Sequence, residues 1–314
     1  MTIALVDGDI IAFKSAVAVV DNNDELAPLV PENAEKYADV MIEEWTRKIK
    51  PRKIIMCFSD PSRHYFRHDI YPEYKANRKT VERPKLLKHT YDYLKDKYDA
   101  IWREGLEADD LLGILGTDPN VPDPVVVSID KDMLTLPVKF FNPDKFNRAV
   151  RINRNIADLN MFKQAMIGDS SDNFKGIPGI GTKKANAIIE SDIRNPWGVT
   201  LQAFKDNHLS EEYAIQMVQL ARILRYGDYK VDTREVKLWH PNEDKWMKLS
   251  TPTTTSMEAL KQSTTSNKSA EDSKETKQSA SQTQSNTSVD TKGKTKRKKT
   301  KSKTSTKRSG IVKD

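Results

Sequence analysis

The stretch PVVVSIDKDML, residues 124–134, decides the fold class of this chain. An apolar run is followed at once by Asp130 and Asp132, which is typical of a fully buried strand that ends in acids. Three further segments repeat this pattern: TIALVDGD (2–9), KIIMCFSDPS (53–62) and AIWREGLEADDLLGIL (100–115). Stretches with helical spacing separate the strands. Apolar strands that alternate with helices predict an α/β domain with a mostly parallel sheet.

The acids that follow these strands predict a metal site. The carboxyl ends of parallel strands meet at one edge of a sheet, which is where such folds bind ligands. All candidate ligands are carboxylates, so hard ions such as Mg²⁺ or Mn²⁺ are favoured, and two such ions suit phosphodiester hydrolysis. The candidates are the strand-end acids and two from GDSSDN (168–173): Asp7, Asp60, Glu107, Asp109, Asp110, Asp130, Asp132, Asp169 and Asp172.

Several of these acids also have a structural interpretation. Asp60 in SDPS is equally suited to start a turn. Asp9 precedes an apolar helix and is expected to cap it, so we leave it off the ligand set. Asp110 can serve the dipole of the following helix and ranks below Glu107 and Asp109. A solvated strand end is the alternative for Asp130 and Asp132.

A basic segment, residues 63–85, can offset the charge of these carboxylates. Within YPEYKANRK (71–79), Tyr74 can stack on a base, and Lys75 and Arg78 share one face of a helix, where they can hold the scissile phosphate. Arg63 and Arg67 add charge for DNA binding. The alternative is a solvated helix face, since residues 63–98 look helical but weakly packed.

A glycine-rich turn precedes a helix in GIPGIGTKKANAII, residues 176–189. Gly179 and Gly181 permit close approach of the backbone, the helix start aims free amides at a phosphate, and Lys183 and Lys184 add charge. Residues 155–230 are otherwise predicted to be helical. The segment therefore resembles the hairpin of a helix–hairpin–helix unit, which holds a duplex backbone.

The net charge of +7 is concentrated in a tail, residues 251–314, which carries +9 and leaves −2 for residues 1–250. Its composition of Ser, Thr, Lys and Gln predicts disorder. Ten Lys or Arg in residues 291–308 are either a solubilising end or a salt-sensitive tether to DNA or an acidic partner. A single cysteine, Cys57, favours a reducing compartment, and the charged N-terminus argues against a signal peptide or membrane span.

The motifs VDGD, FSD, YKANR, EADD, SIDKD, GDSSDN and GIPGIGTKKA stand in the order seen in the 5′-nuclease family. That family includes flap endonucleases, the 5′-nuclease domain of bacterial DNA polymerase I and phage exonucleases. Residues 1–240 resemble it, and QLARILRYGDY followed by VKLW is most similar to the podovirus-type phage 5′→3′ exonucleases.

The resemblance implies a PIN-like catalytic domain (1–154) with a helical arch over the site (about 63–98). It also implies a helical DNA-binding domain (155–250) before the tail (251–314). The implied activity is metal-dependent 5′→3′ hydrolysis of duplex DNA, with RNA primer removal in phage replication or recombination. The acids named above match the family's metal ligands, and Asp9 stands where many members carry an uncharged residue. Lys75 and Arg78, with Tyr74 beside them, match arch residues at the scissile phosphate, and some members bind K⁺ at the hairpin.

Three other functions remain open at this point. A structure-specific flap endonuclease would share every motif. A non-catalytic DNA-binding module would keep the fold and hairpin but is disfavoured because the acids are present. A PIN-type RNase is disfavoured by the hairpin. The expected partners are DNA and, through the tail, replication proteins, and the expected location is the cytoplasm, that of the host if a phage encodes the chain.

Overall fold

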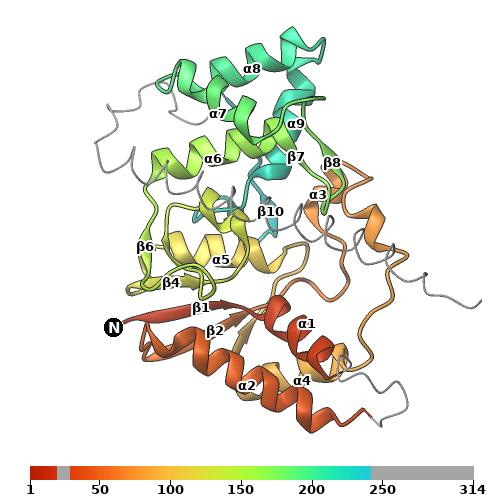
Figure 1. Cartoon of the computed structure of the whole chain (residues 1–314), viewed down its shortest axis with the longest axis vertical. Helices are drawn as coiled ribbons and strands as arrows, with labels where there is room; N and C mark the ends of the chain where they lie inside the picture. The colour runs from red at the N-terminus through yellow and green to blue at the C-terminus, as the bar shows by residue number, and fades with distance from the viewer. Residues whose placement is uncertain (20–28, 242–314) are drawn as a thin grey trace, which may run out of the picture. The chain divides into compact units, whose positions relative to one another are not determined.

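A six-stranded sheet forms the centre of the structure, a computed structural model that describes residues 1–19 and 29–241 (Figure 1). The strand order is β3-β2-β1-β4-β5-β6, and all neighbours run parallel except the edge pair β5–β6. The strands are β1 (Ile3–Asp7), β2 (Lys53–Cys57), β3 (Asp99–Ile101), β4 (Pro124–Val127), β5 (Lys139–Phe141) and β6 (Val150–Arg151). The predicted α/β class with a mostly parallel sheet is confirmed. The sequence predicts β1 to β4, whereas β5 and β6 are too short to show a pattern.

Alternation along β1 assigns the two faces of the sheet. Ala4 and Val6 lie in one core with residues of α1 (Gly8–Ala18), α2 (Pro31–Arg47) and α4 (Leu87–Lys97). Ile3 and Leu5 lie in a second core with residues of α5 (Ala108–Thr117). Figure 1 shows the same division, with α2 and α4 on one side of β1 and β2 and α5 on the other. Both faces are covered, which is why the strands read as continuous apolar runs.

The segment between β2 and β3 differs from its prediction. It holds α3 (Phe66–Ile70), a single 3₁₀ turn η1 (Ala76–Arg78) and α4. Leu87 and Leu94 of α4 are buried against α1 and α2, so the prediction of weak packing is wrong for this helix. Lys75 precedes η1 in a left-handed conformation, φ 54°, so Lys75 and Arg78 do not share an α-helix.

A group of helices follows the sheet, as the sequence predicts. The elements are α6 (Arg154–Ile167), the hairpin β7 (Gly168–Asp169) and β8 (Phe174–Lys175), α7 (Thr182–Ser191), α8 (Pro196–Asp206), α9 (Glu211–Ala221), and the pair β9 (Tyr229–Lys230) and β10 (Glu235–Val236). The helices enclose their own core, with Phe162, Phe204 and Trp239 at its centre. The division into domains at residue 154 stays a prediction, and the predicted tail lies outside the described residues.

Chain order places a switch point in the sheet. After β1 the chain adds β2 and β3 on one side, and it then returns to add β4, β5 and β6 on the other. Open α/β sheets bind ligands at the carboxyl ends of the strands flanking such a point. Here these ends carry Asp7, at the end of β1, and Asp130, just beyond β4. Within residues 1–19 and 29–241, no helix has the length and apolarity needed to cross a membrane.

Candidate active site

Asp7 and Asp130 are joined through Ser128, which is completely buried. The Ser128 hydroxyl donates to Oδ2 of Asp7 at 3.1 Å and accepts from the amide of Asp130 at 3.0 Å. The carboxylate of Asp7 also accepts from the amide of Ile10 at 3.1 Å and so caps α1. Ser128 was not among the predicted site residues. Its place directly after the apolar run of β4 is the signal that could have identified it.

The acids at the switch point repel one another. Burial and the neighbouring carboxylates of Asp9 and Asp130 raise the pKa of Asp7 to about 7. The pKa of Asp109 is raised well above its usual value, mainly by burial and then by the charges of Asp7 and Asp130. Two like charges 4 Å apart repel by about 4 kcal/mol at an effective dielectric of 20. Asp7, Asp109 and Asp130 therefore lie close together, as the sequence predicts, and their charges call for a cation.

Asp9 belongs to this group, which corrects one prediction. The cap expected at Asp9 is formed by Asp7, whereas Asp9 lies inside the first turn of α1. Its carboxylate accepts from the amide of Ser59 at 3.3 Å and from the hydroxyl of Tyr91 at 3.1 Å. Asp9 is also the largest charge effect on the pKa of Asp7. The acid left off the ligand set thus lies among the others.

Asp132 extends the acids toward the β7–β8 hairpin. Burial and Asp130, with a smaller effect from Asp169, raise the pKa of Asp132 to about 7. Asp169 accepts from the amide and hydroxyl of Ser171 at 2.7 and 2.6 Å. Burial alone would raise the pKa of Asp169, but Ser171 and Lys131 outweigh it and lower the pKa. The acids from strand ends and those from GDSSDN therefore meet in one row.

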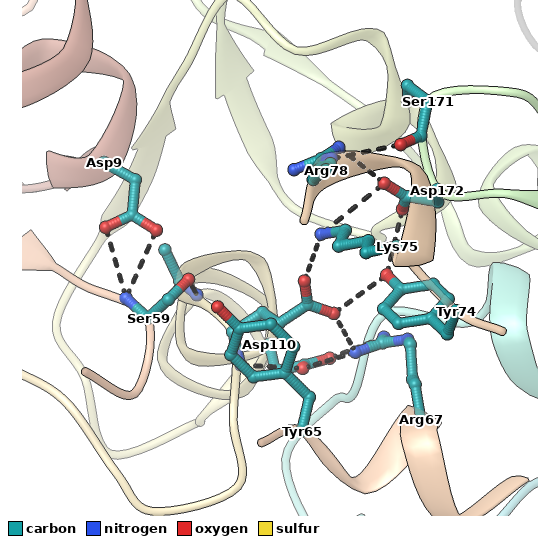
Figure 2. Close-up of polar contacts among 12 residues, drawn as sticks. Asp9, Ser59, Tyr65, Arg67, Tyr74, Lys75, Arg78, Asp110, Ser171 and Asp172 are labelled. Atoms are coloured by element: carbon teal, nitrogen blue, oxygen red, sulfur yellow. Dashed lines mark hydrogen bonds and ion pairs between the residues drawn. The ribbon is translucent and has the colours of Figure 1, made fainter. Parts of the chain in front are cut away.

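Lys75 connects the two halves of this row (Figure 2). Its ammonium forms an ion pair with Oε1 of Glu107 and lies 3.5 Å from Oδ1 of Asp172. Arg78 donates from Nη2 to the same Asp172 oxygen at 2.7 Å. Burial alone would raise the pKa of Glu107, but Lys75 and Arg67 lower it to about 2. The two cations predicted to hold a phosphate thus already lie against the acids.

A network of hydrogen bonds fixes η1 on the loop between β7 and β8. The amide of Lys75 donates to the carbonyl of Asp172 at 2.9 Å, and Asn77 Nδ2 donates to the carbonyl of Ser170 at 2.8 Å. Arg78 Nε donates to the carbonyl of Ser171 at 3.0 Å. These bonds hold Lys75 at a positive φ, which costs free energy in a residue other than glycine and persists where surrounding contacts impose it.

The ring of Tyr74 is buried, with 2% of its surface exposed, so the prediction that it stacks on a base is wrong. The hydroxyl lies 2.9 Å from both Glu107 Oε2 and Asp172 Oδ2. Burial and Glu107 raise the pKa of Tyr74 well above its usual value, so the hydroxyl keeps its proton. The Tyr74 hydroxyl therefore bridges the carboxylates of Glu107 and Asp172.

Arg67 is also buried, which contradicts its prediction as a DNA contact. Its five N–H groups are all engaged. Nη1 donates to Glu107 and Asp110 at 2.8 and 2.7 Å, Nη2 donates to Asp110 and the carbonyl of Arg222 at 2.8 and 2.7 Å, and Nε donates to the carbonyl of Leu220 at 3.2 Å. No donor remains for a phosphate, and Arg67 acts instead by positioning Glu107.

Asp110 and Asp60 also have structural partners. Asp110 is fully buried, and its two oxygens accept from Arg67 and from the amides of Glu107 and Leu224. Four acceptor positions are thus filled, which leaves none for a metal. Asp60 accepts from the amides of Ser62 and Gly105 at 2.9 and 2.8 Å. These contacts match the helix-start and turn interpretations that the sequence left open.

The donor chemistry of the remaining acids fits a hard divalent cation. Asp7, Asp9, Asp109 and Asp130 supply only oxygen, and Lys75 partly offsets the repulsion at Asp9 and Asp109. Within the described residues, no three His, Cys, Asp or Glu side chains converge as a ready ligand set. The fit therefore lies in charge and ligand type.

The glycine-rich turn lies on the surface. Gly179 has φ 74° with open space around it, and Gly181 is the N-cap of α7, with no side chain capping the helix. Lys183 and Lys184 are exposed, and Lys184 donates to the carbonyl of Gly179 at 2.9 Å. An uncapped helix start beside exposed lysines suits a phosphate. Arg63, in the turn after β2, is exposed as well.

Comparisons with known proteins identify the family. The family model described as 5′-3′ exonuclease, N-terminal resolvase-like domain, matches residues 2–158, half of the chain. The exonuclease of Escherichia phage T7 is 27% identical over 222 residues, 60% of this chain and 74% of that protein. The exodeoxyribonuclease of Enterobacteria phage T3 is 25% identical over 224 residues, 60% of this chain and 73% of that protein.

Solved structures agree on the fold. A phage T5 protein co-crystallised with metal ions has a TM-score of 0.54 at 20% identity, covering 70% of this chain and 89% of that chain. The bacteriophage T5 flap endonuclease, solved with DNA and metal ions, has a TM-score of 0.51 at 23% identity over the same shares. Sequence motifs, sheet order and the family match therefore agree, and the chain belongs to the 5′-3′ exonuclease family of nucleases.

Proposed function

We propose that this chain is a divalent-metal-dependent 5′→3′ exodeoxyribonuclease that hydrolyses duplex DNA from its 5′ ends. The observation that carries the proposal is the row of repelling acids from Asp7 to Asp172, in which Asp172 pairs with Lys75 and Arg78 and Asp169 pairs with Lys131. A cluster of this kind costs free energy unless a cation is bound. Such a site suits a substrate that brings negative charge to a metal-rich surface.

Asp7, Asp109 and Asp130 are the proposed ligands of one Mg²⁺, with Asp9 beside them, and Mn²⁺ suits the same oxygen ligands. Asp132, Asp169 and Asp172 are the proposed ligands of a second. When bound, such ions activate a water and stabilise charge on the phosphate oxygens. Glu107 keeps Lys75 and Tyr74 in place. Lys75 and Arg78 then neutralise the scissile phosphate, which competes with Asp172 for both cations.

The hairpin is proposed to hold the duplex away from the cut. Gly179 and Gly181 let the backbone approach a phosphate, and Lys183 and Lys184 add charge. A K⁺ ion at the hairpin, Arg63 as a further DNA contact, RNA primer removal and recruitment of replication proteins by the tail are parts of the same proposal. DNA is the proposed partner because the family consists of nucleases.

The test uses the purified full-length protein and 5′-labelled duplex, flap and RNA–DNA substrates, with Mg²⁺ or with EDTA. We expect cleavage of the duplex from its 5′ end in Mg²⁺ and none in EDTA. Asp130→Asn should lower cleavage at least about a hundredfold and leave duplex binding intact. Asp96→Asn, an exposed acid on α4, is the matched control and should cleave as the wild type does.

Three results separate the proposal from its alternatives. Preferred release of a flap in one piece would assign a structure-specific flap endonuclease. Tight duplex binding with no cleavage under any metal would assign a non-catalytic DNA-binding module. Equal cleavage by Asp130→Asn and the wild type would show that the acids do not carry the chemistry.

A further inference from the structure

A cleft lies at the amino ends of the strands, at the edge of the sheet opposite the acids. It has a volume of about 640 Å³ and is lined by the end of α5, by the start of β4 and by the turn that follows α9. Lys139 of β5 is paired in register with Arg151 of β6, so both cations point from the same edge. The four residues of β4 span about 13 Å, and this separates the cleft from Asp130.

Positive charge is concentrated in this cleft. Residues 1–250 carry a net charge of −2, yet the lining holds six cationic side chains and three acidic ones. The cations are Lys139, Arg151, Arg154, Arg222, Arg225 and Lys237. The acids are Asp118, Asp123 and Asp228. Asp123 pairs with Lys139 and Asp228 with Arg222, and the buried Asp158 pairs with Arg154 and Arg225. The cleft still carries more cations than acids, on a part of the chain that is nearly neutral.

One of these cations, Arg225, is buried. It is 6% exposed, and Nη2 alone has partners, the carbonyl of Thr135 at 2.9 Å and Oδ1 of Asp158 at 2.7 Å. Nε and Nη1 of Arg225 have no hydrogen-bond partner in the described part of the chain. Leaving buried donors of a cation unsatisfied is costly. Burial is also the main cause that lowers the pKa of Arg225, with Arg222 adding to it.

The form of the cleft narrows the class of ligand. Its volume lies within the usual range for small-molecule sites. A guanidinium group can donate two parallel hydrogen bonds to two oxygens of one phosphate. Tyr226 lies on the lining with 51% of its surface exposed, which offers a ring face on which a base can stack. Phosphate recognition beside an exposed aromatic ring favours a nucleotide over a bare anion or an acidic peptide.

We propose that this cleft binds a free nucleotide through Arg151 and Arg225, with its base on Tyr226, while Arg222 stays paired with Asp228. The site is separate from the acids and needs no metal. The turn Arg222–Asp228 nevertheless contacts both regions, because the carbonyl of Arg222 accepts from Arg67 and the amide of Leu224 donates to Asp110. Nucleotide binding therefore acts on the same segment that positions Glu107.

The test is calorimetric titration of the full-length protein with a deoxynucleoside 5′-monophosphate in EDTA, which removes any contribution from bound metal. Arg151→Ala and Tyr226→Ala both alter exposed side chains and should each weaken binding, Arg151→Ala by about tenfold. Lys36→Ala removes an equal charge from the exposed face of α2 and should bind as the wild type does. Lys75→Ala should also bind normally.

Three outcomes would overturn the proposal. Equal affinity in Arg151→Ala and Lys36→Ala would show that the cleft is not the site. A loss of binding confined to Lys75→Ala would place the nucleotide among the acids. A single-stranded oligonucleotide that binds through Arg151 while the mononucleotide does not would assign a strand-binding groove instead. Failure of the nuclease assay would affect none of these results, because no cleavage is measured.

Discussion

At the scale of single residues, the sequence predicts which acids meet at the edge of the sheet better than it predicts which residues position them. Asp7, Asp109 and Asp130 follow from one rule, since each comes just after a strand end or opens the next helix at the same edge. Arg67 and Asp110 carry no comparable signal. Their roles depend on carbonyl and amide groups of residues 220–224, which only the folded chain brings near. The charge of a side chain suggests which ligands it could bind, whereas its burial decides which groups it can contact.

Asp7→Asn should separate charge from structure. Asparagine caps a helix as well as aspartate does, so α1 is retained. The pKa of Asp7 is raised to about 7, so protonation favours the fold, and in EDTA the free energy of unfolding should fall as pH rises through that value. The variant should flatten this slope between about pH 4 and 7, gain up to about 4 kcal/mol at pH 8 and lose cleavage. Urea unfolding at several pH values measures it, and an unchanged slope would contradict it.

Arg67→Lys should reveal the difference between a positioning residue and a DNA contact. Lysine has three donors on a point charge and cannot match the five contacts of the guanidinium. We expect a loss of about 3 kcal/mol or more in stability and a fall in cleavage, with an unchanged salt slope of DNA binding in the fraction that folds. Arg63→Ala should do the reverse, keeping stability and reducing the slope. A reduced slope in Arg67→Lys alone would restore its prediction as a phosphate ligand.

At the scale of elements, short segments escape sequence patterns and long ones do not. The helices α2, α6 and α9 show clear apolar spacing, and β1, β2 and β4 read as buried runs. The 3₁₀ turn η1 was predicted as a helix because Lys75 and Arg78 stand three apart. Its true form follows from hydrogen bonds to residues 170–172, nearly a hundred positions away. A contact this distant in sequence leaves no local trace.

The hairpin before α7 gives an element-scale prediction. Lys183→Ala and Lys184→Ala should each lower the salt slope of duplex binding by about one, because each removes one phosphate contact. Stability should change little, since both side chains are exposed. Fluorescence anisotropy with labelled duplex from low to moderate salt provides the measurement. Lys36→Ala serves as the control for loss of one charge, and equal slopes in all three variants would rule out the hairpin as a duplex site.

At the scale of the whole molecule, the fold class and the family were both predicted from the sequence. Apolar strands that end in acids predict an α/β sheet, and the predicted 5′-3′ exonuclease activity and family are confirmed. The basic cleft was not predicted, because its cations come from four separate segments between residues 139 and 237. Only the pairing of β5 with β6 and the turn after α9 bring them together.

Deletion of residues 251–314 tests the tail at this scale. The segment carries a net charge of +9, so its loss should weaken DNA binding mainly at low salt and leave the cleavage pattern intact. Binding curves at several salt concentrations, with cleavage ladders from the same samples, provide the readout. If both proteins show the same dependence on salt, the tail is a solubilising end and not a tether.

In the turn formed by residues 222–228, the backbone and the side chains serve different regions of the molecule. Its carbonyl and amide groups serve Arg67 and Asp110, while its guanidinium groups face the basic cleft. Main-chain groups are the same whatever residue carries them, so replacements here can exchange one ligand preference for another while the acceptors of Arg67 persist. Selection is thereby free to remodel the cleft on its own, and related chains can share the acids at the switch point yet differ in what they bind in the basic cleft.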